Sequence, residues 1–153
     1  MTTFVKDYLE RLEALHAEVE KALEGLPQVG LDWSPGPEMN SIAVQIVHLV
    51  GAERYWIGDI IAGDPSNRIR EAEFQVRGLS SLELKRRLSD SYAYIHRRLA
   101  TLSKGDLDDL RTSPRDGRAI SVAWVLLQIL EHTALHLGHI QVTRQLWHLR
   151  QIA

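Results

Sequence analysis

Histidines gather in one short part of the sequence. Three of the chain's seven histidines, His132, His136 and His139, lie within the stretch EHTALHLGHI, residues 131–140. The apolar residues around them predict a helix that is buried along at least one side. Successive residues of an α-helix turn by about 100°, so His136 lies about 40° from His132, and His139 about 20° from it. All three imidazoles therefore project from one stripe of the predicted helix.

An i, i+4 pair of histidines can hold one divalent metal ion, because the two side chains meet on the same helix face. The same HxxxH spacing occurs in core or interface histidines whose nitrogens are satisfied by hydrogen bonds. The pair His132 and His136 is therefore a weak indication of a metal site when it is taken alone.

A further histidine, His48, lies in a second apolar segment, within the run IVHLV at residues 46–50. A buried imidazole loses its hydration and needs compensation, which a metal shared with His132 and His136 would supply. Two ligands from one helix and one from a facing helix make a tris-histidine site with an open coordination position. His16, beside the apolar stripe of the first helix, is the rival third ligand, and scattered core histidines are the plainer alternative. Two others are predicted to face solvent or an interface: His96 and His148.

Apolar residues recur at steps of three and four in four segments, which predicts four amphipathic or buried helices. These segments cover approximately residues 5–26, 41–62, 80–102 and 121 onward. We therefore expect an all-α chain of one domain, residues 1–153, folded as a four-helix bundle. Connections of more than about ten residues allow crossovers, so simple up-and-down topology is not implied. No segment shows the alternation that is typical of a strand.

The connections carry their own signals. Ser80 and Glu83 have the spacing of a capping box, and Asp116 with Gly117 predicts a tight turn. Residues 63–79 show no clear period, and this segment is longer than most helix connections. Because such segments often cover or gate a site, we expect this one to lie near the functional residues.

Composition excludes several classes of function. The net charge of −2 provides no basic surface for a nucleic acid or an anionic membrane. The chain has no cysteine, which excludes disulfides, thiolate metal ligands and a cysteine nucleophile. The charged first twenty residues lack the apolar core of a signal peptide, so we expect a cytoplasmic protein. Phosphate-binding Gly-rich loops, the G-x-S-x-G elbow and the HExxH motif are all absent from the sequence.

Two stretches resemble the DinB/YfiT-like superfamily of metal-dependent enzymes, and the resemblance covers almost the whole chain. The first is LDWSPGPEMNSIAVQIVHLVGAERYW, residues 31–56, which is similar to the family's proline-rich approach to a histidine-bearing second helix. The second is EHTALHLGHIQVTRQL, residues 131–146, which is similar to the closing HxxxH motif with its following glycine, here Gly138. His139 stands where the family usually has a glutamine. The resemblance assigns the family's metal-ligand positions to His48, His132 and His136.

The resemblance implies a four-helix bundle with a divalent metal, commonly zinc or nickel, at one end of the helix interface. Members with known activity use a low-molecular-weight thiol, such as mycothiol or bacillithiol, in transfer or isomerisation reactions. We therefore expect a metal-dependent enzyme acting on a small molecule, either a thiol-dependent transferase or a hydrolase. Because the chain has no cysteine, the thiol would come from outside. The alternative is a non-catalytic metal-binding stress or ligand-binding protein.

Several other side chains are candidates for the surroundings of the metal. They are Tyr55, Glu131, His139 and Gln141. Tyr55 lies seven positions after His48, on roughly the same helix face, so we expect a pocket beside the metal between Tyr55 and His139. Each candidate also has a plainer interpretation as a surface or packing residue. Glu53 and Arg54 are predicted to form an exposed charged pair rather than a catalytic dyad.

The apolar surface of the predicted helices exceeds what one small bundle needs to bury. Four tryptophans and the nearly all-round apolar stretches of the second and fourth helices indicate an interface. Many members of the superfamily that the chain resembles are dimers. We therefore expect a homodimer.

Overall fold

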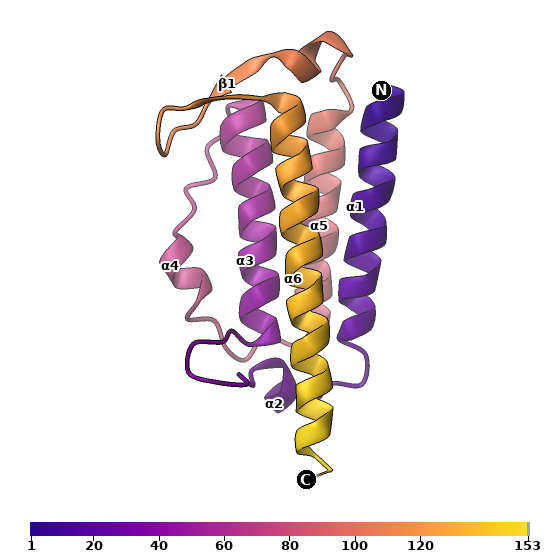
Figure 1. Cartoon of the computed structure of the whole chain (residues 1–153), viewed down its shortest axis with the longest axis vertical. Coiled ribbons are helices and arrows are strands. Elements are labelled where there is room, and N and C mark those ends of the chain that lie inside the picture. Colours follow the sequence, from indigo (N-terminus) through magenta and orange to yellow (C-terminus); the bar gives the residue numbers. More distant parts are fainter. Residues whose placement is uncertain (153) are drawn as a thin grey trace.

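The four segments with helical spacing fold as four long helices packed side by side, which confirms the expected four-helix bundle (Figure 1). The computed structural model describes residues 1–152; Ala153, the last residue of the expected domain, lies outside the described residues. The long helices are α1 (Thr3–Ala22), α3 (Ile42–Arg54) continued by the π-helix η1 (Tyr55–Ala62), α5 (Ser81–Leu99) and α6 (Val122–Arg150). The shorter elements are α2 (Gln28–Leu31), α4 (Arg70–Glu73), the 3₁₀-helix η2 (Gly105–Asp108), β1 (Leu110–Thr112) and β2 (Ala119–Ser121).

Every long α-helix begins after a serine or threonine whose side-chain oxygen accepts a hydrogen bond from a backbone N–H three residues further on. These N-caps are Thr2, Ser41, Ser80 and Ser121. The predicted capping box is confirmed, since the carboxylate of Glu83 also accepts from the backbone N–H of Ser80 at 2.8 Å. A cap of this kind satisfies amides that have no partner within the helix, so it fixes the residue at which each helix starts.

The order of the helices requires one long return connection. In Figure 1, α1 and α6 run downward, whereas α3 and α5 run upward. Each helix packs against two neighbours, α1 against α5 and α6, and α3 against the same two. Since α3 and α5 are parallel neighbours, residues 63–80 must travel back along the outside of the bundle, and they carry α4 on the way. The expected crossover is therefore present, and it brings α4 against α3.

The core divides into two apolar clusters along the bundle axis. One contains Leu12, Ile57 and Leu126, and the other contains Ile46, Leu88 and Ile140. Between them each long helix contributes one polar residue to a buried layer: His16, Glu53, Ser91 and Thr133. No helix within residues 1–152 combines the length and the apolar character needed to cross a membrane.

Contrary to the expectation of no strands, β1 and β2 form a short antiparallel hairpin with Arg111 opposite Ile120. The turn between them includes Asp116, and Gly117 takes a φ of +71°, so the predicted tight turn is present. Each strand has only three residues, and among these six only Ile120 is buried. Such a short pair leaves no alternating pattern to detect in the sequence.

Candidate metal centre

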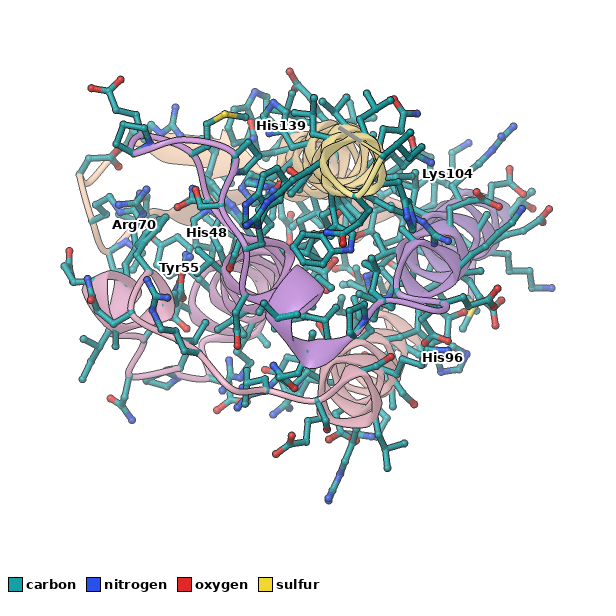
Figure 2. The ribbon with its side chains drawn as sticks, turned by 90° about the horizontal axis from the view of Figure 1, so that it is seen from below. His48, Tyr55, Arg70, His96, Lys104 and His139 are labelled. Atoms are coloured by element: carbon teal, nitrogen blue, oxygen red, sulfur yellow. The ribbon has the colours of Figure 1, made fainter. Side chains whose placement is uncertain are left out.

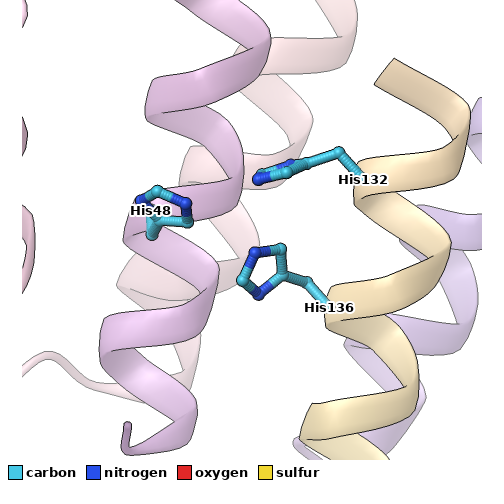
Figure 3. Close-up of side chains that lie close together, drawn as sticks. All are labelled: His48, His132 and His136. Atoms are coloured by element: carbon cyan, nitrogen blue, oxygen red, sulfur yellow. The ribbon is translucent and has the colours of Figure 1, made fainter. Parts of the chain in front are cut away.

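Three histidines from two neighbouring helices face one another. Each of His48, His132 and His136 offers a ring nitrogen, and these three atoms all lie within 4.8 Å of one another. The ring centroids of His132 and His136 are 4.4 Å apart, and those of His48 and its two neighbours are 5.2 and 5.0 Å apart. Figure 3 shows the two rings of α6 reaching towards α3. The structure therefore brings together the three residues that the sequence singled out.

Local helix geometry explains this arrangement. His132 and His136 are one turn apart on α6, so both side chains leave the same face of that helix. α6 packs directly against α3. The first half of α3 is buried almost all round, and His48 lies at the middle of this helix. His48 is buried, whereas His132 and His136 are half-buried. The triad thus lies at a helix interface with one side towards the surface.

The outer nitrogen of His48 is held by a carboxylate from the crossover. His48 Nδ1 lies 2.9 Å from Glu73 Oε2, at the end of α4. A carboxylate only accepts hydrogen bonds, so Nδ1 donates to Glu73, and Arg68 Nη2 lies 3.3 Å from the same nitrogen. Arg68 fixes Glu73 in turn, because its Nε and Nη2 donate to the two carboxylate oxygens at 2.5 and 2.7 Å. A histidine bound in this way has one defined tautomer and ring orientation.

The charge of Glu73 is compatible with its burial. Loss of solvation raises the pKa of the carboxyl group, but the hydrogen bonds from Arg68 and His48 and their positive charges outweigh it and leave the pKa of Glu73 below its usual value. Glu73 is therefore ionised at neutral pH and accepts from both neighbours. Hydrogen bonds therefore connect the guanidinium of Arg68 to the carboxylate of Glu73, and this carboxylate to the imidazole of His48, which faces the other two histidines.

Glycine at position 51 makes room for this chain of contacts. Gly51 lies three residues after His48 on α3, directly beneath the carboxylate. A Cβ atom at this position would overlap Glu73 Oε1 and would lie 3.2 Å from Arg68 Nε. A side chain at position 51 would therefore displace the Glu73 carboxylate from its present position.

The imidazoles of α6 are neutral over most of the pH range. Burial, followed by the charge of His48, lowers the pKa of His132 to about 4. Burial, followed by the charge of His132, lowers the pKa of His136 to the same value of about 4. Metal ligands must be deprotonated, so protons compete for these two nitrogens only at distinctly acidic pH. In addition, the buried Nδ1 of His136 has no hydrogen-bond partner among the described residues.

This set of donors fits a divalent transition-metal ion. Three imidazoles suit zinc and nickel, and three protein ligands leave a coordination position open. Within residues 1–152 the group contains His48, His132 and His136 and no fourth ligand. His139 is exposed, and its ring centroid lies 5.9 Å from that of His136. The residues present therefore match an open site rather than a closed one.

A cavity of about 290 Å³ opens beside His136. Its walls come from the loop before α3, including Met39, and from α6, including His139 and Val142. Gln45, one turn before His48 on α3, also lines it. A molecule of small-metabolite size therefore has access to His136 from the surface.

Tyr55 does not line this cavity, contrary to the expectation. Tyr55 is the first residue of η1, which continues α3, and in the end-on view of Figure 2 its label falls close to that of His48. However, seven residues of helix separate them by about 10 Å along the axis, and the cavity extends the other way, towards Gln45. Tyr55 is instead buried in the apolar core, with the guanidinium of Arg115 5.0 Å above its ring.

The other candidates lie at the surface. Glu131 and Gln141 are exposed on α6, and Gln141 borders a different hollow together with Arg144. His139 is the one candidate that lines the cavity beside His136. His96 is exposed on the far side of the bundle from His48 (Figure 2).

His16, the rival ligand, belongs to the separate polar layer. Its Nε2 lies 2.8 Å from Glu53 Oε1, which also accepts from the hydroxyl of Thr133 at 3.1 Å. The second oxygen of Glu53 accepts from Ser91 at 2.5 Å. Glu53 is only 1% exposed, so the predicted exposed pair with Arg54 is wrong. The residue was misjudged because its partners are distant in sequence, whereas the adjacent arginine suggested a surface pair.

Comparisons with known proteins identify the family and the fold of this chain. The family model of the DinB superfamily matches residues 11–140. A conserved protein from Enterococcus faecalis is similar in structure, with a TM-score of 0.77 at 16% identity, over 95% of this chain and 98% of that one. A DinB-like protein from Bacillus cereus has a TM-score of 0.74 at 15% identity, over 92% and 91% of the two chains.

A third similar structure is YfiT from Bacillus subtilis, described as a probable metal-dependent hydrolase with an unusual four-helix bundle topology. Its TM-score is 0.75 at 16% identity, and the match covers 95% of this chain and 89% of that one. Likeness at this level of identity establishes the fold. A comparison with proteins of curated function returned no match.

The contact between Glu73 and His48 yields a test by substitution. Glu73→Gln keeps an oxygen acceptor but removes the charge that holds the His48 tautomer and pairs with Arg68, so zinc affinity should fall by roughly 10- to 100-fold. Competition with a chromophoric chelator measures the affinity. Glu71→Gln, an exposed neighbour on the same short helix, is the matched control and should bind zinc as the wild type does. Equal affinities in the two variants would remove Glu73 from the site.

Proposed function

The chain belongs to the DinB superfamily, and on that premise we propose that it is a metal-dependent enzyme acting on a small molecule, either a hydrolase or a thiol-dependent transferase. One observation carries the proposal: three histidines from α3 and α6 converge, and a cavity that reaches the surface opens beside one of them, His136. A structural metal site is normally closed by four protein ligands, whereas a catalytic one keeps a position for water or substrate.

Zinc or nickel is the proposed metal, in keeping with the imidazole donors. When bound, such an ion supplies a positive charge that lowers the pKa of a water or thiol beside it. A water would serve hydrolysis, and a thiol from outside the protein would serve transfer, since the chain has no cysteine of its own.

The protein's own groups have three tasks in this proposal. Glu73 holds His48 by accepting a hydrogen bond from its Nδ1, which keeps Nε2 directed away from the carboxylate. The apolar walls formed by Met39 and Val142 hold the body of the substrate and exclude water. His139, on the cavity wall, is placed to donate or accept a proton at the reacting group through an imidazole nitrogen.

Removal of the triad tests the metal site itself. Replacing His48, His132 and His136 by alanine should abolish stoichiometric metal content while helical circular dichroism is largely retained. Metal is measured by elemental analysis of protein purified without a histidine tag. His96→Ala, which removes an exposed histidine of α5, is the control and should keep its metal. Equal metal content in the wild type and the triple variant would contradict the proposal.

The catalytic part of the proposal has a separate readout. A cobalt-loaded sample with an open position should develop a sulfur-to-metal charge-transfer band when 2-mercaptoethanol is added. A cobalt spectrum that does not change at millimolar thiol would favour the alternative, a non-catalytic metal-binding protein.

A homodimer is the second part of the proposal, and the outer face of α6 supports it. Large apolar side chains remain exposed there along the whole helix, among them Leu127 at 58%, Leu135 at 56% and Leu149 at 61%. With Val142, which is 48% exposed, they recur at steps of seven or eight, so they form one stripe over about six turns. Gly138 lies within this stripe, and nothing stands within 4 Å of the position of its missing Cβ. A second copy packed about a two-fold axis would cover the stripe with an identical one.

Leu135, near the middle of α6, tests this interface. Light scattering should give the wild type twice the chain's 17.4 kDa. Leu135→Glu should give a monomer, because the two-fold axis would bring two introduced charges together in an apolar contact. Leu82→Glu, at a leucine of α5 that is also exposed, should leave the mass unchanged. A wild-type mass of 17.4 kDa across micromolar concentrations would rule out the dimer.

A further inference from the structure

The wall of the cavity contains a buried amide oxygen without a partner. Gln45 is 4% exposed and lines the cavity beside His136. Its Nε2 donates to the backbone oxygen of Asn40 at 3.2 Å and to the hydroxyl of Thr143 at 3.3 Å. Its Oε1 has no hydrogen-bond partner in the described chain. A buried acceptor left unsatisfied in this way destabilises the folded state.

The orientation of this amide is fixed by its neighbours. The carbonyl oxygen of Asn40 can only accept, so it requires the NH₂ end of Gln45. The hydroxyl of Thr143 gives its proton to the backbone oxygen of His139 at 2.8 Å, so it too must accept from Gln45. An inverted amide would place two acceptors against each other at both contacts. Oε1 is therefore the atom that lacks a donor.

The position of Gln45 relates it to the metal centre. It lies three residues before His48 on α3, and side chains at this spacing are neighbours on one helix face. The cavity touches both Gln45 and His136. A molecule that reaches His136 through this cavity therefore also lies beside the side chain of Gln45.

The charges around the cavity restrict that molecule further. Among the described residues that line it, Glu38 is the one with a formal charge at neutral pH, and no lysine or arginine is present. Arg144 of α6 donates to the backbone oxygen of Lys21 and lines a different hollow, so it does not supply a positive charge to this cavity. An anionic group at the end of the ligand away from the proposed metal would thus meet a carboxylate and an amide oxygen, with no side-chain cation on the cavity wall to balance it.

We infer that the ligand of this cavity carries an uncharged or cationic N–H or O–H group that donates to Gln45 Oε1 while its metal-binding atom lies at His48, His132 and His136. This inference rests on the proposed function and narrows its substrate class to amines, amides and alcohols. Gln45 is then a specificity-determining residue, and thiols whose tails end in a carboxylate are poor ligands.

Thiols with tails of similar length test the inference. Cobalt-loaded protein is titrated with 2-mercaptoethanol, cysteamine, 1-propanethiol and 3-mercaptopropionate, and the charge-transfer band reports each dissociation constant. The hydroxyl and ammonium tails should bind roughly three- to tenfold tighter than the methyl tail, the worth of one hydrogen bond, and the carboxylate tail should bind most weakly. Because the thiols differ in acidity, the deciding comparison is between wild type and variants.

Gln45→Leu and Gln45→Met should each abolish the preference for the donor tails. Gln141→Leu, an exposed glutamine of α6 outside the cavity, should behave as the wild type does. Methionine has nearly the length of glutamine and no polar group, so Gln45→Met provides a second comparison if Gln45→Leu loses its circular dichroism. Unchanged ratios among the four thiols in both Gln45 variants would overturn the inference.

A second measurement separates this inference from the proposed function. If no thiol produces a band, the open coordination position fails, and zinc-loaded protein is then titrated with acetamide and with N,N-dimethylacetamide, which has no N–H. A shift of the Gln45 side-chain amide signals in nuclear magnetic resonance spectra with acetamide alone supports the donor contact. Equal shifts with both compounds, or no shift with either, overturn it.

Discussion

His48 has two ring nitrogens to satisfy inside a helix segment that is otherwise buried and mostly apolar, and much of the structure follows from how each is compensated. Glu73 accepts from Nδ1, and Arg68 neutralises Glu73. The remaining nitrogen faces two imidazoles of α6, which burial keeps neutral. Three imidazoles that converge at this partly buried helix interface need a shared partner, and a divalent cation would supply it.

The crossover connects this chemistry to the topology. Parallel packing of α3 and α5 forces the chain to return along the outside, and the return segment brings Arg68 and Glu73 against the back of His48. Gly51 lets it approach closely enough. A second set of buried contacts involves all four long helices. Glu53 accepts hydrogen bonds from one residue of each of the other three: His16, Ser91 and Thr133. A buried polar layer of this kind favours one axial register of the four helices, which keeps Thr133 and the adjacent His132 in place.

Helical periodicity was enough to predict the four long helices, the capping box and the convergence of His132 and His136 on one face. It also identified His48 as a buried histidine that needs compensation. The pairing of Glu73 with His48 could not be predicted, because the two residues are 25 positions apart and Glu73 lies in a segment without a period. The same reason hid the contact between His16 and Glu53. The role of Gln45 depends on which end of its amide is already occupied, and only the contacts with Asn40 and Thr143 reveal that.

X-ray absorption at the zinc edge tests the central claim most directly, because multiple scattering from the rings counts the imidazoles around the metal. The zinc-loaded protein should show three imidazole nitrogens at about 2.0–2.1 Å with one further light atom, and added 2-mercaptoethanol should introduce one sulfur at about 2.3 Å. Four imidazoles that persist in the presence of thiol, or fewer than three in its absence, would contradict an open site formed by His48, His132 and His136.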